Sequence, residues 1–493
     1  PLYPIYQRDA DGKFILDAAG KKQFDYGQSR PSGAQSNYNS IATLFNDKFS
    51  LNNDNVSARG YMSFLDLKEG VLQGLKFTMN LGVDYVSQLR HTYENPFFGN
   101  AAGSKGRTFR YNYRTHSYTF NQLLTYNRTF ADVHKIDLLL GHENYQYKYN
   151  YLRAGKTGFP FGGIYELDGA STVYDASSYI DEYALESYMS RLNYSYNDRY
   201  YFSASFRTDG SSRFHKDSRW GKFWSVGANW RISEEAFMEG LDWLDNMSVR
   251  ASYGLQGNDK VGGYYPWQAL YSLGYPNAGA SGAIVGSLEN KDLMWETNKN
   301  LNIGVEGRFL NRFSASIEWY KRYTADMLMN YPIALSLGFT GYDKNIGEMT
   351  NSGLEMSFTA EVIQTDDFRW SLGLMGSTVT NEVTQLADKP EITDGNYIIK
   401  EGEVLYSFYL PKSAGVDPAT GKQLYWVWDG DDKDNQYISA DATKALQCRQ
   451  LAGSRVPDLY GSISNEFSYK GFDLSILCTY SLGGKVLDGT YNG

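Results

Sequence analysis

The stretch LKFTMNLGVDY, residues Leu75–Tyr85, decides the fold. Polar or very small side chains alternate there with apolar ones at Leu75, Phe77, Met79, Leu81, Val83 and Tyr85. Because successive side chains of a β-strand point to opposite faces, this period of two predicts a strand with one apolar and one polar face. Its eleven residues are enough for a tilted strand to cross a lipid bilayer.

The same alternation returns at Phe313–Trp319, Leu354–Val362, Phe368–Leu374 and Phe472–Tyr480. Together with turn residues, it predicts about fourteen strands. They are expected at 56–66, 74–86, 114–127, 134–148, 184–197, 199–207, 222–232, 247–256, 299–310, 312–323, 352–363, 368–380, 459–469 and 471–482. Amphipathic strands repeated this often predict an all-β fold, an antiparallel barrel, and a barrel of this size favours a transporter over an enzyme.

The connections between these strands alternate between short and long. Short ones are predicted at 197–199, 310–312, 365–367 and 470–471, longer turns at 67–73 and 128–133, and a helix of one or two turns, capped by Ser233, at 233–246. Polar loops are predicted at 87–113, 149–183, 208–221, 257–298, 324–351 and 381–458. Transmembrane barrels have short periplasmic turns and long extracellular loops, so we expect residues 1–55 to be one more extracellular loop in a single domain, 1–493.

Composition agrees with a membrane barrel and excludes other classes. There is no apolar run of about 18 residues, as a transmembrane helix would need. The mean hydropathy of -0.49 is compatible with a barrel, in which every second strand residue faces water. The net charge of -9 disfavours nucleic acid as a partner. Two cysteines, Cys448 and Cys478, make neither a disulfide framework nor a zinc motif.

The two strand faces differ in polarity. Trp230, Trp319 and Trp370 fall on apolar faces, and their neighbours Arg231, Glu318 and Arg369 fall on the opposite ones. A wide, hydrated lumen accepts such charges, whereas a small closed core does not. By the same pattern, the side chains of the last strand are expected to face lipid at Leu474 and Ile476 and the lumen at Asp473 and Ser475. The wet side of a soluble sandwich is the alternative, but the alternating loop lengths favour the membrane.

Six blocks of sequence, in the same order, resemble the SusC/RagA-type TonB-dependent transporters of the Gram-negative outer membrane. They include YNDRYYFSASFRTDGSSRF at Tyr196–Phe214, RWGKFWSVGANWRISEEAF at Arg219–Phe237, VRASYGLQGN at Val249–Asn258 and NIGEMTNSG at Asn345–Gly353. The other two are Leu293–Leu328 and Tyr469–Ser475. The resemblance implies a barrel of about 22 strands, of which this chain holds about fourteen. It also implies that the plug and the segment that contacts TonB, like the strands at both ends of the barrel, lie outside this chain.

The resemblance further implies a function. A member of this family is expected to import an oligomeric nutrient, a glycan oligosaccharide or a peptide, with a SusD-like lipoprotein as a lid and TonB as the energy source. It needs no cofactor and does no covalent chemistry. A siderophore or cobalamin receptor of the same architecture is one alternative. A secreted β-rich glycan-binding protein, adhesin or glycoside hydrolase is another, and only a barrel would need detergent for extraction.

Candidate substrate-binding residues are the aromatic clusters of the long loops, because aromatic rings stack on the C–H faces of sugars. They are Tyr264, Tyr265, Trp267, Tyr271, Tyr406, Tyr409, Tyr425, Trp426 and Trp428. Packing within the loops or against a lid protein is the simpler alternative. The acidic turn with Asp429, Asp431 and Asp434 is a weak candidate for a cation site, since Lys433 intrudes and calcium-loop spacing is not kept.

Overall fold

The computed structural model describes residues 4–26, 39–386 and 390–488. The α-helices in this part of the chain are short, α1 (Ser40–Asn46) and α2 (Ala442–Gln447), and most of the regular structure is β-strand. No helix among the described residues is both long and apolar enough to cross a membrane. The chain divides into two compact units: Pro1–Met62, Thr78–Gln122 and Glu143–Leu185 form unit 1, and Ser63–Phe77, Leu123–His142 and Glu186–Gly493 form unit 2.

Unit 1 contains most of five long strands that neighbour one another in chain order. They are β1 (Lys48–Phe64), β2 (Leu75–Glu94), β3 (Arg107–Phe130), β4 (His134–Thr157) and β5 (Thr172–Tyr196), with the 3-10 turns η1 (Ala102–Ser104) and η2 (Leu167–Gly169) between them. The strands are longer than predicted. Much of the predicted loops 87–113 and 149–183 is strand, so those loop boundaries are wrong, and β1 begins at Lys48, inside the predicted loop 1–55.

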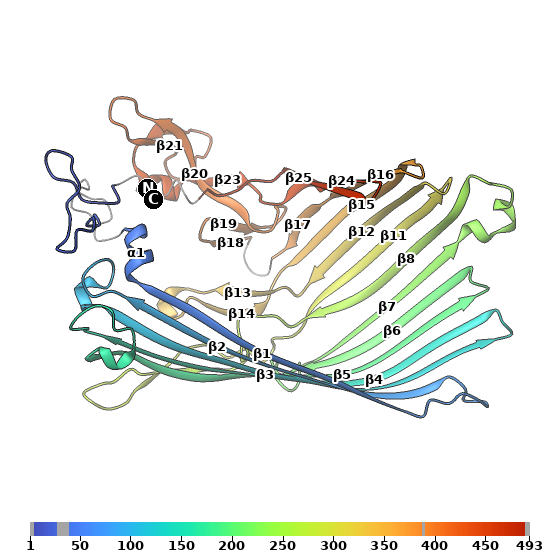
Figure 1. Ribbon diagram of the computed structural model, residues 1–493. Helices are drawn as coiled ribbons and strands as arrows, with labels where there is room; N and C mark the ends of the chain where they lie inside the picture. The colour runs from blue at the N-terminus through green and yellow to red at the C-terminus, as the bar shows by residue number, and fades with distance from the viewer. Residues whose placement is uncertain (1–3, 27–38, 387–389, 489–493) are drawn as a thin grey trace. The chain divides into compact units, whose positions relative to one another are not determined.

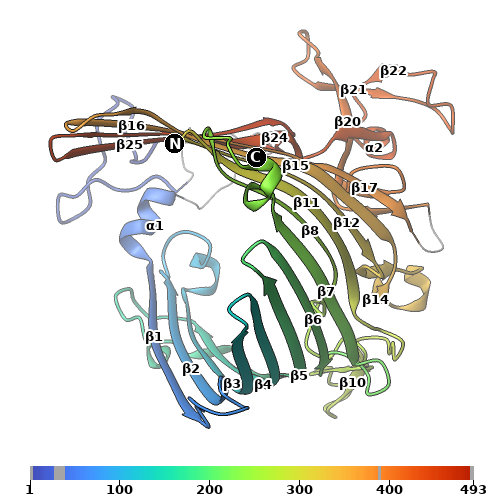
Figure 2. The same cartoon turned by 90° about the vertical axis from the view of Figure 1, so that its right-hand side faces the viewer.

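In the main sheet of unit 2, each strand pairs antiparallel with the next. The order is β6 (Tyr200–Ser211), β7 (Trp220–Arg231), β8 (Leu244–Asn258), β11 (Glu296–Phe309), β12 (Phe313–Ala325), β15 (Glu348–Gln364), β16 (Phe368–Thr378), β24 (Pro457–Tyr469) and β25 (Phe472–Gly483). These strands lie side by side as long arrows in Figure 1, and β8, β11 and β12 do so again in Figure 2. The prediction of fourteen strands in an antiparallel sheet is confirmed.

Short turns connect the strands at one end because their backbone suits a hairpin. Asn197 and Asp198 have φ of 52° and 50°, and Leu310 and Asn311 have φ of 53° and 56°. Positive φ at both central residues is typical of the type I′ turn, whose twist matches that of the paired strands. The short connections predicted at 197–199 and 310–312 are confirmed.

The connection from β7 to β8 differs from the prediction. The predicted helix with Ser233 as its cap is wrong. The structure has two 3-10 turns instead, η3 (Ile232–Glu234), which contains Ser233, and η4 (Ala236–Met238). The carboxylate of Glu235 holds the turn in place. It accepts hydrogen bonds from the Arg199 guanidinium at 3.1 Å and from the Trp230 indole at 2.9 Å. Such bonds between neighbouring turns are not visible in a sequence pattern.

The long connections of unit 2 contain small sheets of their own. β9 (Tyr271–Leu273) pairs with β10 (Ala283–Val285), and β13 (Leu328–Pro332), followed by η5 (Leu335–Leu337), pairs with β14 (Gly341–Asn345). β17 (Thr380–Gln385) pairs with β15. The segment between β17 and β24, hereafter the insert, forms a further sheet. Its strands are β18 (Glu391–Asp394), β19 (Tyr397–Lys400), β20 (Ser407–Val416), β21 (Gln423–Val427), β22 (Tyr437–Ser439) and β23 (Arg449–Gly453). Figure 2 shows β20, β21, β22 and α2 together in this insert.

Alternation gives the large sheet of unit 2 an apolar face and a polar face. The register places Val305, Ile317 and Met356 in one row across β11, β12 and β15. Ile317 is 55% exposed, as one face of a membrane sheet should be. One residue along, Glu306 and Ser316 form a row on the opposite, polar face. In β25, Leu474 lies opposite Phe467 and Ser475 opposite Glu466, which agrees with the predicted alternation; the exposure of these two faces to lipid and lumen stays a prediction.

Candidate functional site

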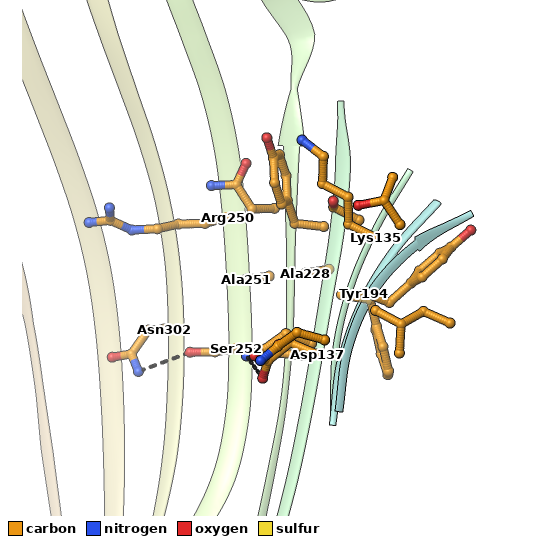
Figure 3. A pocket seen from close by; sticks show the side chains of 18 of the residues that line it. Lys135, Asp137, Tyr194, Ala228, Arg250, Ala251, Ser252 and Asn302 are labelled. Carbon is orange, nitrogen blue, oxygen red and sulfur yellow. Dashed lines mark hydrogen bonds between the residues drawn. The ribbon is translucent and has the colours of Figure 1, made fainter. Parts of the chain in front are cut away.

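A cavity of about 850 Å³ lies on the polar face of unit 2, near the strand ends that the short turns connect. Six neighbouring strands, β3 to β8, supply most of its lining, and β11 and β12 complete it. Figure 3 shows the cavity with Lys135 and Asp137 of β4, Arg250 and Ser252 of β8 and Asn302 of β11 around it. Strand alternation explains this lining, because every second residue of each strand reaches the same face.

Small side chains hollow the wall at this level. Ser203, Gly227 and Ser252 stand opposite one another in a row across β6, β7 and β8. Asn302 continues the row on β11 and donates its amide to the Ser252 hydroxyl at 3.4 Å. A Cβ at Gly227 would approach the Ser203 oxygen to 2.9 Å. The missing side chains leave a recess in which hydroxyl and amide groups serve as hydrogen-bonding partners.

A second row carries the charge of the cavity. Arg250, Gly304 and Glu318 stand opposite one another across β8, β11 and β12. The Arg250 guanidinium crosses over Gly304 and donates to Glu318 at 2.6 and 2.9 Å, and it also donates to Glu306 at 2.8 Å. A Cβ at Gly304 would lie 3.1 Å from Arg250 and 3.2 Å from Glu318. Glycine therefore allows an ion pair to form across an intervening strand.

Other charges on this face are paired as well, so the wall is polar without a strong field of one sign. The Lys135 ammonium contacts both oxygens of Asp198 at 2.6 and 2.7 Å. The Asp137 carboxylate accepts from the Asn193 amide at 3.4 Å and lies 3.8 Å from Arg191. Within the described ranges, no group of three or more His, Cys, Asp or Glu side chains is placed to hold a metal ion.

The first predicted aromatic cluster packs between loops. The Arg213 guanidinium lies over the Tyr264 ring at 5.4 Å, and the His215 ring meets Trp267 edge-on at 5.1 Å. Tyr265 is half-buried in the same loop. Tyr271, in β9, is 65% exposed and is the member most accessible to a ligand. In this cluster, Tyr264 and Trp267 therefore pack against neighbouring side chains, whereas Tyr271 is exposed to solvent.

The insert holds the other predicted aromatic residues. Tyr406 meets Tyr397 edge-on, and Tyr425 and Trp426 lie in β21. Trp428 is only 6% exposed, in a small core with Val427, Ala445 and Cys448. Tyr409 and Trp428 come together in a cavity of about 220 Å³, although they are far apart in sequence. A contact of any of these residues with substrate stays a prediction.

The acidic turn does not assemble the candidate cation site. The Lys444 ammonium of α2 donates to the Asp429 carboxylate, and this hydrogen bond lowers the pKa of Asp429. Asp431 and Asp434 are exposed on the turn. No cluster of three ligands forms in the described part of the chain, so the carboxylates belong to a solvated turn with one lysine partner.

Sequence reasoning missed a further set of aromatic residues in unit 1. Tyr145, Tyr147, Tyr149 and Tyr151 recur at every second position of β4. The signal was present as an i, i+2 repeat, but part of it fell in a segment taken as loop. Each of these tyrosines is an even number of residues from Lys135, which lies on the polar face of β4. Because side chains alternate along a strand, the tyrosines lie on the same polar face.

Comparison with known proteins agrees with this architecture. Residues 5–485 match the family described as TonB dependent receptor-like, beta-barrel. The chain belongs to this family. Among its relatives, TonB-dependent receptor P39 of Formosa agariphila is 30% identical over 464 residues, which cover 84% of this chain and 44% of that protein. TonB-dependent receptor SusC of Bacteroides thetaiotaomicron is 25% identical and covers 99% of this chain and 50% of SusC.

A solved structure of the RagAB peptide transporter matches with a TM-score of 0.80 at 26% identity, over 94% of this chain and 51% of that one. This TonB-dependent receptor chain is thus of the SusC/RagA type, and it is part of an outer-membrane β-barrel, as the sequence predicts. The chain spans about half the length of the relatives that it matches.

Proposed function

We propose that the whole protein imports an oligosaccharide across the outer membrane. The observation that carries this proposal is the contrast between the two faces of one sheet. The apolar face exposes Ile317 and its neighbours, whereas the polar face forms a hollow of about 850 Å³ with paired charges. A wall of hydroxyl, amide and paired ionic groups suits the passage of a hydrated, weakly charged solute, which needs weak and repeated hydrogen bonds.

Peptide import is the second candidate, because the RagAB structure is that of a peptide transporter and resembles this chain at a TM-score of 0.80. Uptake separates the two candidates. Cells that carry the whole protein are incubated with labelled neutral hexasaccharides or labelled oligopeptides. We expect saccharide uptake that a protonophore abolishes while surface binding remains, because TonB supplies energy only for passage. Peptide uptake alone, or uptake that the protonophore leaves unchanged, would contradict the proposal.

A SusD-like lipoprotein is the proposed lid, and the insert after β17 is the surface that we expect it to contact. Exposed apolar side chains gather there on separate segments: Val416 is 56%, Ile438 50% and Leu446 61% exposed. Apolar groups on protruding loops are typical of protein contacts. A rigid sheet also presents them at lower entropic cost than a disordered loop would.

The register of β20 and β23 suggests a clean test of the lid. Pro411 pairs with Arg449, so residues 412–448 can be replaced by Asn-Gly, which closes a two-residue hairpin. The change removes the whole core around Val427 and leaves the separate core around Ile392 in place. We expect co-purification with the lid lipoprotein to be lost, while the whole protein stays folded and extractable in detergent.

The matched control is a Gly-Ser insertion after Gly70, at the short-turn end, where a Cβ would meet nothing within 4 Å. We expect this variant to retain the lid. Undiminished co-purification of the 412–448 replacement would mean that the lid contacts another surface or that none exists.

A further inference from the structure

A continuous platform of aromatic rings covers the polar face of β3, β4 and β5 in unit 1. Its members are Phe109, Tyr111, Tyr113, Tyr149, Tyr151 and Tyr179, hereafter the tyrosine platform. Tyr111 and Tyr113 lie parallel at 5.9 Å with 3° between their planes. Tyr151 lies 5.3 Å from Tyr113 and 4.8 Å from Tyr179, so every ring touches another member.

The platform is partly open. Tyr179 is 50% exposed, and the other five rings are half-buried. Packing among the rings holds their orientation, so a ligand would find a preformed surface and little side-chain entropy would be lost on binding. Tyrosine offers an apolar face together with a hydroxyl, which suits a ligand whose surface alternates C–H patches with hydroxyl groups.

Most of the charge beside the platform is paired. Arg107 donates to Glu94 of β2 at 2.6 and 3.0 Å, and Arg153 pairs with Asp175. The Arg90 guanidinium of β2 lies over Tyr111 at 5.0 Å and over Phe49 at 5.4 Å. A surround in which two of these three arginines are neutralised by carboxylates fits an uncharged ligand, and guanidinium and carboxylate forks are suited to its hydroxyl groups.

The position of the platform along β4 places it beyond the membrane. Tyr149 is 15 residues from His134, the first residue of this 24-residue strand. At ~3.3 Å per residue and a tilt of ~40°, these residues rise about 38 Å, which exceeds an apolar band about 25 Å tall. The platform would therefore lie on the extracellular side, where a ligand is captured before passage.

We propose that the tyrosine platform binds consecutive rings of a neutral oligosaccharide by stacking. This inference rests on the proposed function and names the residues that select the substrate. Rings held flat by their neighbours accept pyranose C–H faces, while Tyr hydroxyls and the adjacent Arg and Asp groups take the sugar hydroxyls. A peptide would gain less, because few of its side chains present a flat C–H face with hydroxyls at the edge.

The test is binding of the whole protein, with its lid, to an array of neutral hexasaccharides and to oligopeptides. Tyr151→Ala with Tyr179→Ala removes the closest pair of the platform, and we expect a loss of saccharide affinity of about tenfold or more. Tyr151→Phe with Tyr179→Phe keeps the rings and should stay within about threefold of the wild type. Tyr118→Ala is the matched control on the opposite face of β3, with a side chain that is 37% exposed, and should change nothing.

The outcomes separate the two proposals. Wild-type protein that binds oligopeptides and no saccharide overturns the proposed function and the platform with it. Wild-type protein that binds and imports saccharide, with unchanged affinity in the double alanine variant, overturns the platform alone. Each variant is first checked for a folded barrel by its heat-dependent mobility in gel electrophoresis, and the single variant Tyr179→Ala, at the 50% exposed ring, carries the test if the double alanine variant does not fold. A loss of saccharide affinity in Tyr179→Ala would support stacking, and an unchanged affinity would contradict it.

Discussion

Replacing Ile317 by arginine tests the membrane placement of the sheet. Ile317 lies on the apolar face of β12, in one row with Val305 and Met356. On this face the apolar run of β12 extends from Phe313 to Trp319 and ends before Lys321. Ile317 is four residues from Phe313 and four from Lys321. At ~3.4 Å per residue and a tilt of ~40°, four residues rise about 10 Å, which is near the middle of an apolar band about 25 Å tall.

That depth sets the expected magnitude. Arginine at the bilayer midplane costs about 2–4 kcal/mol on the lipid face of a barrel. The matched variant is Ser316→Arg, one residue away on the polar face, where the new side chain meets water. Ser316 exchanges a hydrogen bond of 2.7 Å with Ser357, and its loss should cost about 1 kcal/mol. The difference between the two variants is therefore about 1–3 kcal/mol, a factor of roughly 5–150 in the unfolding equilibrium.

The measurement is denaturant unfolding of the whole protein in phospholipid vesicles, followed by tryptophan fluorescence. The free energy of unfolding is extrapolated from the midpoint and slope of each transition. Ile317→Leu serves as a volume-conserving control and should change the midpoint little. Equal losses for the two arginine variants, or a larger loss for Ser316→Arg, would refute the assignment of the faces.

Two further predictions concern the loops. Phe214 is fully buried and packs 5.5 Å from Trp295, so Phe214→Ala should cost about 3–5 kcal/mol locally and make loop 212–219 sensitive to protease while the strands stay protected. Uniform protection would show that the loop repacks. Burial raises the pKa of Asp343 in β14, whose protonated form therefore favours the folded loop, and the stability of this loop should fall as pH rises through that pKa. Asp343→Asn should remove this dependence, and proteolysis rates at β13–β14 measured at pH 4 and pH 8 check it.

The sequence predicted the membrane part of the sheet well because lipid on one side and water on the other impose alternation. Every one of the fourteen predicted strands is present, and the two-residue turn at Leu310–Asn311 lies where predicted. The extensions of these strands beyond the membrane were missed because the alternation is lost there. Beyond the membrane both faces meet water, and β4 alternates Tyr149 and Tyr151 with Asn150 and Leu152, which is no longer an apolar–polar pattern.

For the loops, the sequence showed which residue types gather in each segment but not which of them are buried or in contact. Aromatic clusters were visible, but burial depends on contacts between distant segments. Trp428 is enclosed because α2 returns Ala445 and Cys448 to it, and no local pattern contains that information. Strands as short as β22, with three residues, give too few positions for a period to be seen. The partner of Asp429 was equally hidden, since Lys444 lies fifteen residues away.

The insert between β17 and β24 also determines the order in which the sheet can form. Most neighbours in unit 2 are joined by connections that bring them together locally, but β16 ends at Thr378 and its partner β24 begins at Pro457. Closing a flexible segment of 78 residues (379–456) instead of a two-residue turn costs about 3 kcal/mol more in chain entropy. Because the insert has its own core around Val427, folding it first shortens the effective loop. We therefore expect the pairing of β16 with β24 to follow the folding of the insert, and until then β16 presents an unpaired strand edge of the kind that promotes aggregation.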